Sequence, residues 1–135
     1  TVAHKFDKKI YLEYYDDNNT LVRDFIPVVR KSDNKVVGMI DFRHYLSDFL
    51  LNYGGNIGYS VLPNERRKGY ASQMLGLMLN ECKQENVSEV LLTCDKENIA
   101  SSKTIIKNGG ILENEVEDTV NLSKSGIIQR YWITL

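Results

Sequence analysis

The chain has 135 residues, of which 42% are hydrophobic and 26% are charged, and its net charge is −1. This length and composition predict a single domain over residues 1–135 with its own hydrophobic core. The near-neutral charge argues against nucleic acid or an anionic membrane as a partner. No apolar run approaches the length of a membrane span, and the first residues lack the apolar stretch of a signal peptide.

The two cysteines, Cys82 and Cys94, do not make a disulfide framework in a chain that can build a core. We therefore expect reduced thiols and a cytoplasmic protein. The cysteines and the two histidines lie at scattered positions without the spacing of metal ligands, so no metal is expected.

The first half of the chain favours β-structure. Residues 9–15 are compatible with a strand or a short helix. Two β-rich runs at residues 25–30 and 36–43 flank a polar turn and predict a hairpin. Residues 45–51 predict a short helical turn, and residues 56–62 predict a further strand.

The clearest helix is predicted over residues 70–85. Its apolar residues recur at helical spacing and form one stripe, made of Tyr70, Ala71, Met74, Leu75, Met78, Leu79 and Cys82. A strand at residues 87–94 follows. The strands on either side of this helix therefore form a βαβ unit and are expected to be parallel.

A second helix is predicted from Asn98 to about Asn108, where Gly109 and Gly110 end it. Two antiparallel strands, at residues 111–116 and 127–134, complete the chain. The predicted fold class is α/β, with a mixed, largely antiparallel sheet, a central parallel βαβ unit and helices on both faces.

A loop with three consecutive cations, at residues 66–68, precedes the first helix. The first amides of a helix have no partner within the helix, and the helix dipole adds partial positive charge there. The amides of residues 67–72 can therefore cradle a phosphate group, and Gly69 lets a pyrophosphate approach closely. A solvated basic loop that only caps the helix is the alternative. The joint order of strand, proline, cations, Gly-x-Ala and helix favours the anion site.

The segment Arg66-Arg67-Lys68-Gly69-Tyr70-Ala71 resembles the Gln/Arg-x-x-Gly-x-Gly/Ala signature of the GNAT (Gcn5-related) N-acetyltransferase family. Residues 57–63 look like the central strand of that family. Residues 98–110 resemble its later helix, which packs along coenzyme A. The resemblance covers residues 25–135 and implies a GNAT-like fold.

The resemblance also implies a reaction. Acetyl-CoA would be the donor, and a primary amine of a small molecule or peptide would attack its thioester directly. The amides from Arg67 to Ser72 would hold the pyrophosphate, and the side chains of Arg66, Arg67 and Lys68 can neutralise further charge at the rim. The amide of Val61 or a neighbour would polarise the thioester carbonyl, and Asn98 and Ser101 would contact the cofactor from the other side.

The general acid departs from the family pattern. Many members carry a tyrosine seven residues after the equivalent of Asn98, where this chain has Ile105. Tyr131 is our candidate substitute, with Tyr59 and Tyr70 as alternatives. A buried aromatic pair of Tyr131 and Trp132 is the favoured structural explanation of the same residue.

The general base departs from the pattern as well. Relatives often place Glu or His near the start of the central strand, where this chain has Asn56, which cannot act as a base. His44 is the candidate because its side chain titrates near neutral pH, with Asp41 and Glu97 as alternatives. A lone histidine in a loop more often has a structural or solvated role.

Other functions compete with acetyl transfer. The missing acid and base motivate a coenzyme A-binding regulatory module without turnover. A basic-loop domain that binds nucleic acid would need a continuous positive face, which the composition does not favour. Cys94 as an acyl-carrying nucleophile lacks a Cys-His-Asp/Asn order in the sequence, and a small buried hydrophobe is the stronger explanation.

The sequence does not name the acceptor. The N-terminal part is short for the family, whose first strand is usually followed by two helices. The substrate pocket is then either reduced or completed by a second chain, as in a homodimer. The acidic run at residues 113–118 could attract a cationic amine, although a solvated turn is the favoured explanation.

Overall fold

The computed structural model describes residues 2–4, 12–15, 17–19 and 21–135. None of the described helices is long and apolar enough to cross a membrane. The elements in chain order are β1 (Val2–His4), β2 (Leu12–Tyr15), β3 (Leu21–Arg30), β4 (Val36–Arg43), the π-helical turn η1 (Leu50–Gly54), β5 (Ile57–Val61), the 3-10 turn η2 (Pro63–Glu65), α1 (Tyr70–Gln84), β6 (Glu89–Asp95), α2 (Ile99–Lys107), β7 (Ile111–Glu117) and β8 (Ile127–Thr134).

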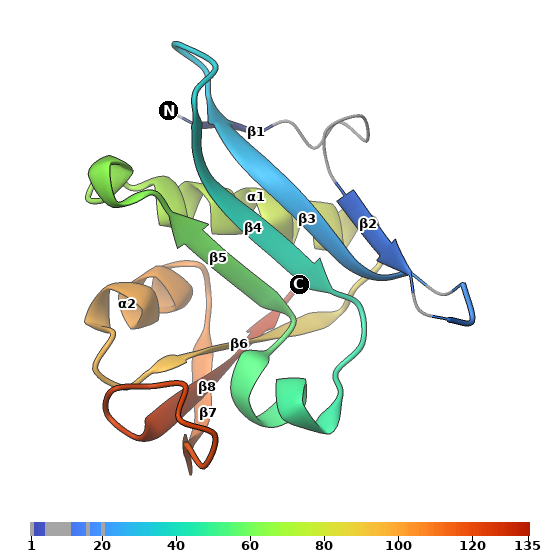
Figure 1. Cartoon of the computed structure of the whole chain (residues 1–135), viewed down its shortest axis with the longest axis vertical. Helices are drawn as coiled ribbons and strands as arrows, with labels where there is room; N and C mark the ends of the chain where they lie inside the picture. The colour runs from blue at the N-terminus through green and yellow to red at the C-terminus, as the bar shows by residue number, and fades with distance from the viewer. Residues whose placement is uncertain (1, 5–11, 16, 20) are drawn as a thin grey trace.

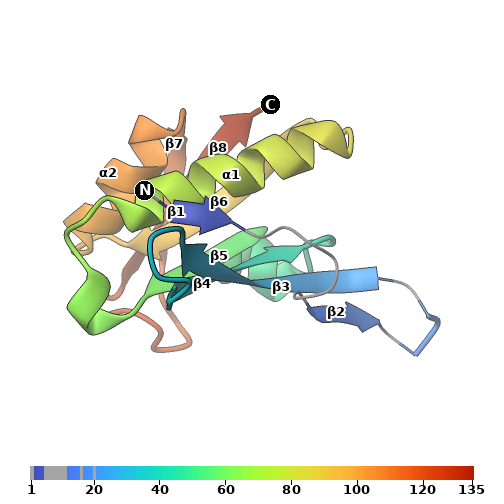
Figure 2. The same ribbon diagram turned by 90° about the horizontal axis from the view of Figure 1, so that it is seen from above.

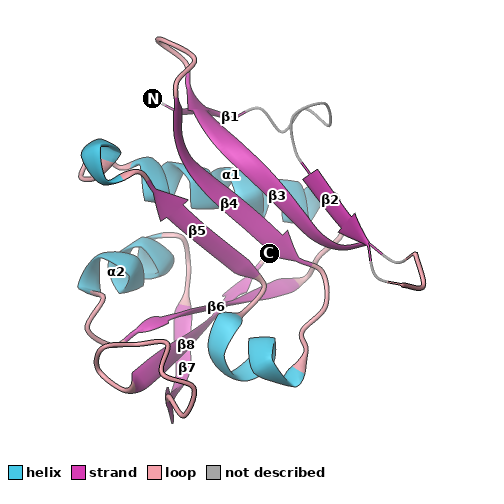
Figure 3. Ribbon diagram, viewed as in Figure 1, coloured by secondary structure: helices cyan, strands magenta, loops and turns pink. Residues whose placement is uncertain are grey.

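The strands form two antiparallel sheets (Figures 1 and 3). The larger sheet has the order β1-β3-β4-β5, and β2 pairs with β3 beside β1. The smaller sheet has the order β6-β8-β7. The predicted hairpin is confirmed as β3 and β4, and residues 12–15 of the ambiguous N-terminal segment form a strand. Residues 9–11 lie outside the described residues.

The two sheets meet where β5 begins. Gly55 forms a bridge with Leu92, and the Asn56 amide donates to the Leu91 carbonyl at 2.7 Å. The two strands then diverge (Figure 1). The expected parallel pair of β5 and β6 is therefore not a continuous ladder in the described chain. The reason is that the Leu91 amide donates to the Asn56 side chain at 2.8 Å, so a side chain replaces the next backbone partner.

Helix α1 packs against β1, β4 and β5 with the stripe that its sequence predicts. Its buried residues are Tyr70, Met74, Leu75, Met78, Leu79 and Cys82. Helix α2 packs against α1 and β6, and both helices lie on the same side of the larger sheet (Figure 2). The expected helical cover is thus seen on one face of this sheet, because the connections from β5 to β6 and from β6 to β7 both pass on that side.

The predicted helical turn at residues 45–51 begins later in the structure. It occupies residues 48–54, mostly as the π-helical turn η1. η1 contacts β6 and β8 of the smaller sheet. Thr93 Oγ1 donates to the Tyr53 carbonyl at 2.7 Å, which fixes this turn beside the place where the sheets diverge.

Candidate functional site

The start of α1 has the geometry of an anion site. The first helical bond runs from the Gln73 amide to the Gly69 carbonyl at 3.2 Å. The amides of residues 70–72 come before it and have no carbonyl of their own helix to bond. Gly69 has φ +81, and an added Cβ would come no closer than 3.8 Å to another atom. Backbone conformation, and not crowding, therefore explains the glycine.

Arg67 also adopts a left-handed conformation, with φ +65. This conformation costs a residue with a Cβ about 1 kcal/mol. The Arg67 guanidinium makes no hydrogen bond or ion pair with the described residues. Arg67 therefore combines a strained backbone with a guanidinium that has no partner among the described residues. Backbone strain of this kind is often found at binding sites.

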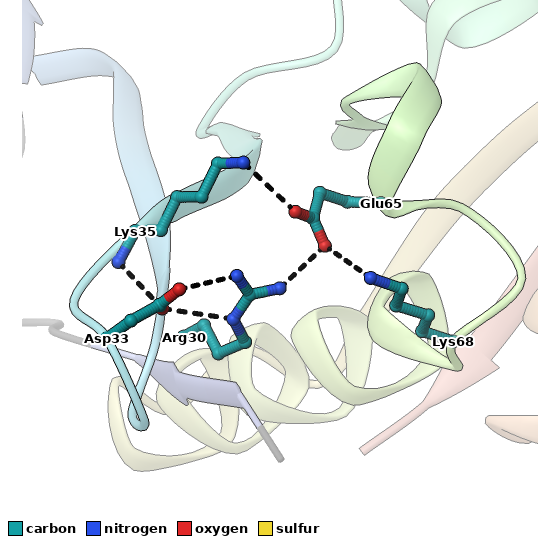
Figure 4. A network of polar contacts seen from close by, with 5 residues as sticks. All are labelled: Arg30, Asp33, Lys35, Glu65 and Lys68. Carbon is teal, nitrogen blue, oxygen red and sulfur yellow. Dashed lines mark hydrogen bonds and ion pairs between the residues drawn. The ribbon is translucent and has the colours of Figure 1, made fainter.

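Lys68 forms an ion pair with Glu65 (Figure 4). Lys68 Nζ lies 2.9 Å from Glu65 Oε2, and the same carboxylate meets Arg30 at 2.7 Å and Lys35 at 3.3 Å. The Glu65 side chain is only 5% exposed, and the hydrogen bond from Lys68 is the main reason that its pKa is lowered. Of the three cations that the sequence assigned to the phosphate, Lys68 is thus committed to a carboxylate.

The same network reaches the hairpin between β3 and β4. Arg30 forms a two-point ion pair with Asp33, with Nη2 to Oδ2 at 2.6 Å and Nε to Oδ1 at 3.0 Å. This pairing lowers the pKa of Asp33 to about 2. The loop before α1 is therefore fastened to the larger sheet through Glu65 and Arg30 and does not depend on α1 alone.

The outer edge of β5 offers backbone groups to a ligand. The bonds from Arg43 N to Asn56 O at 2.6 Å and from Leu62 N to Val37 O at 2.9 Å mark the hydrogen-bonded pairs with β4. In an antiparallel ladder these pairs alternate, so the amides of residues 57, 59 and 61 point away from β4. They face the gap between β5 and β6, as the resemblance requires for Val61.

Arg66 closes the end of this edge. Its Nε donates to the Val61 carbonyl at 3.1 Å. The loop cation and the end of β5 are therefore joined directly, and the Val61 amide stays on the open edge. This contact brings two of the predicted cofactor residues together.

Helix α2 borders the same gap. Asn98 caps it by accepting from the Ser101 amide at 3.1 Å, and Ser101 Oγ lies 2.9 Å from the Tyr59 hydroxyl on β5. Ser72 at the start of α1 accepts from Asn108 Nδ2 at 3.2 Å. Ser101 thus lies next to β5, and Asn98 lies at the start of the same helix, but both side chains already serve contacts within the protein.

Tyr131 lies buried on β8, at 4% exposure, and its hydroxyl donates to Gln129 Oε1 at 2.9 Å. Burial, and then the neighbouring Cys94, raise the pKa of Tyr131, and burial also raises the pKa of Tyr59. Both phenols therefore hold their protons at neutral pH. Burial raises the pKa of Cys94 to about 11, so this group is a thiol and not a nucleophilic thiolate.

His44 faces away from the gap. Its Nε2 lies 2.9 Å from Asp24 Oδ2 on β3, which neighbours β4 on the side opposite β5. Asp24 also borders a cavity of about 30 Å³, next to Met78 and Cys82 of α1, with room for about one water molecule. The structure therefore does not bring His44 together with the cofactor residues.

The alternative bases are also engaged or exposed. Asp41 is 7% exposed, accepts a hydrogen bond from Arg23 Nε at 2.9 Å and forms an ion pair with Arg43 Nε at 2.9 Å. Glu97 is exposed in the turn before α2. Within the described residues no three His, Cys, Asp or Glu side chains come together as a metal-binding set.

Sequence reasoning missed two features of this region. One is the role of Asn56, whose side chain joins the two sheets. The other is the Arg23–Asp41–Arg43 cluster on the face of the larger sheet opposite α1. The alternation of residues 41–43 in a strand could have placed Asp41 and Arg43 on one face, but the β3 register that adds Arg23 has no signal in the sequence.

The comparisons with known proteins identify the family of this chain. The sequence model of the acetyltransferase (GNAT) family matches residues 3–105. This chain belongs to the GNAT family. An uncharacterised N-acetyltransferase of Bacillus subtilis (strain 168), YjdG, is 31% identical over 100 residues, which are 73% of this chain and 58% of YjdG. The chain therefore spans little more than half the length of that relative.

Solved GNAT structures share the fold. A GNAT acetyltransferase from Bacillus anthracis superposes with a TM-score of 0.68 at 25% identity, over 82% of this chain and 65% of its own. The microcin C7 self-immunity acetyltransferase MccE, solved with acetyl-CoA and AMP, gives a TM-score of 0.66 at 20% identity, over 84% of this chain and 61% of its own. The second likeness supports the fold alone.

Proposed function

We propose that this protein transfers an acetyl group from acetyl-CoA to a primary amine of a small molecule or peptide. The observation that carries the proposal is the loop before α1. It combines two left-handed residues, Arg67 and Gly69, with helix amides and an Arg67 guanidinium that have no partner among the residues that the structure describes. These features suit a pyrophosphate, and the open edge of β5 continues from the same loop.

In this proposal, residues 66–72 hold the pyrophosphate, mainly through backbone amides and Arg67. Arg66 acts indirectly, because it fixes the end of β5. The Val61 amide is the proposed donor to the thioester carbonyl, where developing negative charge would be stabilised by a preorganised N–H group. Asn98 and Ser101 form the opposite wall of the gap.

When bound, acetyl-CoA supplies an activated thioester. The protein orients the amine. As the new C–N bond forms and the C–S bond breaks, the attacking nitrogen loses one proton to solvent water, and a phenol of the protein donates one proton to the departing thiolate and is reprotonated from solvent. We propose Tyr131 for this role and keep Tyr59 as its alternative, because both phenols are protonated and lie beside Cys94. Since a thiolate is a fair leaving group, we expect positioning of the reactants to contribute more than the acid.

A coenzyme A-binding regulatory module is the second candidate. The pairing of His44 with Asp24 and of Tyr131 with Gln129 favours it, because each proposed catalytic side chain has a partner inside the protein. The two candidates separate in an assay of thiol release from acetyl-CoA over a broad panel of amines. Binding of acetyl-CoA without thiol release from any amine would support the module.

The loop itself is tested by Gly69→Glu. We expect this change to abolish acetyl-CoA binding, measured by calorimetry, because a carboxylate would lie where the pyrophosphate binds. Gly126→Glu is the matched control, since Gly126 also has a positive φ, +77, with no atom within 4 Å of an added Cβ. Equal affinity in the two folded variants would reject the placement of the cofactor.

A further inference from the structure

A cavity of about 540 Å³ lies on the face of the larger sheet opposite α1. It is lined by Arg23, Arg43, Tyr45, Leu46, Ser47, Phe49 and Leu50. Two of these residues are arginines, and most of the others are apolar or aromatic. Tyr45 and Phe49 are 61% and 49% exposed as whole residues, so their side chains can cover the apolar body of a small ligand.

The arginines carry more charge than their partner neutralises. A single carboxylate, Asp41, forms ion pairs with the Nε atoms of both arginines at 2.9 Å, so the trio has a net charge of +1. Arg43 Nη1 also donates to the Gly54 carbonyl at 2.8 Å. The two terminal nitrogens of Arg23 and Nη2 of Arg43 make no hydrogen bond within the described chain. These nitrogens are donors for an oxyanion, which guanidinium groups bind in a two-point geometry.

The cavity adjoins the gap that we assign to the cofactor. An added Cβ on Gly58 of β5 would lie 2.8 Å from Arg43 Nη2, so this guanidinium lies directly over β5. Arg43 also binds the carbonyls of Gly54 and Gly55, where the two sheets separate. A ligand in the cavity therefore lies beside the start of β5, on the face that α1 and α2 leave open.

We propose that this cavity binds the acceptor and selects an amine that also carries an oxyanion, either a carboxylate or a phosphate, on an apolar or aromatic body. The inference rests on the proposed acetyl transfer and names its substrate class. The amine faces the gap while the oxyanion pairs with Arg23 and Arg43. A polycationic amine is disfavoured because the trio repels it.

The test compares matched acceptors in steady-state thiol release. Phenylalanine and tyramine phosphate carry the two oxyanions, phenethylamine carries none, and spermidine is the polycation. We expect kcat/KM for at least one oxyanion-bearing amine to exceed that for phenethylamine and spermidine by about tenfold or more, as a charge-assisted pair allows. The two oxyanion arms show which group the arginines prefer.

The variant Arg23→Gln should remove this preference by raising KM for the oxyanion-bearing amines, and Arg23→Lys should partly restore it. Lys103→Gln, which removes an exposed cation on α2, is the control and should keep the preference. Equal kcat/KM for phenylalanine, tyramine phosphate and phenethylamine would overturn the inference while leaving acetyl transfer intact.

Absence of turnover with every amine would count against the proposed function instead. In that case the oxyanion site of the cavity is still tested by calorimetry with phenylalanine and tyramine phosphate in the presence of coenzyme A. Binding that is lost in Arg23→Gln would support the site. No binding of either compound to the wild-type protein would overturn it.

Discussion

At the scale of single residues, the loop before α1 allows the effect of its left-handed backbone conformation to be separated from the effect of a charged side chain. Gly69 supplies a left-handed conformation without cost, whereas Arg67 adopts one against the preference of its Cβ. If backbone shape alone were needed, glycine would serve at both positions. The arginine at residue 67 therefore supports the proposal that its side chain contributes to cofactor binding, and this contribution can be measured separately from stability.

Arg67→Gly should separate the two properties. We expect the free energy of unfolding to rise by up to about 1 kcal/mol relative to Arg67→Ala, because glycine adopts φ +65 without strain. Both variants should bind acetyl-CoA about tenfold more weakly, since each lacks the guanidinium. Urea unfolding and calorimetry measure the two effects. Wild-type affinity in Arg67→Gly would show that the loop needs only its shape.

At the scale of elements, the sequence predicted most of what periodicity and turn chemistry control. The stripe from Tyr70 to Cys82 predicted α1, and this helix begins directly after Gly69 as its segment indicated. The anion site at this loop remains a prediction. The contacts between side chains could not be predicted from the sequence, because they depend on the register between strands that are distant in the chain. Asp24 and His44 are 20 residues apart, and nothing in the sequence signals that β3 turns this histidine away from β5.

The structural role of Asn56 between the two sheets is the clearest example of a feature that the sequence did not indicate. A position that the family resemblance assigns to a base instead holds the junction of two sheets. Its Oδ1 accepts from the Leu91 amide at 2.8 Å, and its Nδ2 donates to the Arg43 carbonyl at 3.1 Å. Asn56 is 8% exposed. An amide with one acceptor and one donor is required here, which a carboxylate cannot supply.

Asn56→Ala should therefore lower the free energy of unfolding by about 2–4 kcal/mol, because it leaves the buried Leu91 amide and the Arg43 carbonyl without their side-chain partner. Asn52→Ala is the control, since the Asn52 side chain is exposed and makes one bond, to the Asp48 carbonyl at 2.8 Å. Urea unfolding measures both. A loss in Asn56→Ala no larger than in Asn52→Ala would show that the junction does not depend on this side chain.

At the scale of the whole molecule, the two sheets divide the proposed reaction between them. The larger sheet carries the loop for the pyrophosphate and, on its other face, the cavity for the acceptor. The smaller sheet and α2 form the opposite wall of the gap, with Tyr131 behind it. The Asn56 side chain joins the two sheets where they separate, together with the bridge from Gly55 to Leu92, so both proposed ligands lie next to this junction.

The stability of the whole molecule should pass through a maximum with pH, because its buried and paired groups titrate at shifted pKa values. Hydrogen bonds and ion pairs lower the pKa of several carboxyl groups in the folded state, namely Asp33, to about 2, and Glu65, Asp95, Glu113 and Glu115. The unfolded chain binds protons more readily, so stability is lost as pH falls from about 5 towards 2.

At alkaline pH the stability changes in the opposite direction and decreases as the pH rises. Burial raises the pKa of Cys82 to about 12 and that of Cys94 to about 11, from an ordinary value of 9.0. The folded state keeps these protons when the unfolded chain has released them, so this stability is present below pH 9 and is lost between about pH 9 and 12. Urea unfolding from pH 3 to 10.5 should therefore give a free energy of unfolding that decreases at both ends of this range.

Two variants identify the groups responsible. Cys82→Ala, although less stable overall, should lose less free energy of unfolding at alkaline pH than the wild-type protein does. Glu65→Gln should reduce only the loss at acid pH. An alkaline limb of equal slope in Cys82→Ala would exclude this thiol as its source.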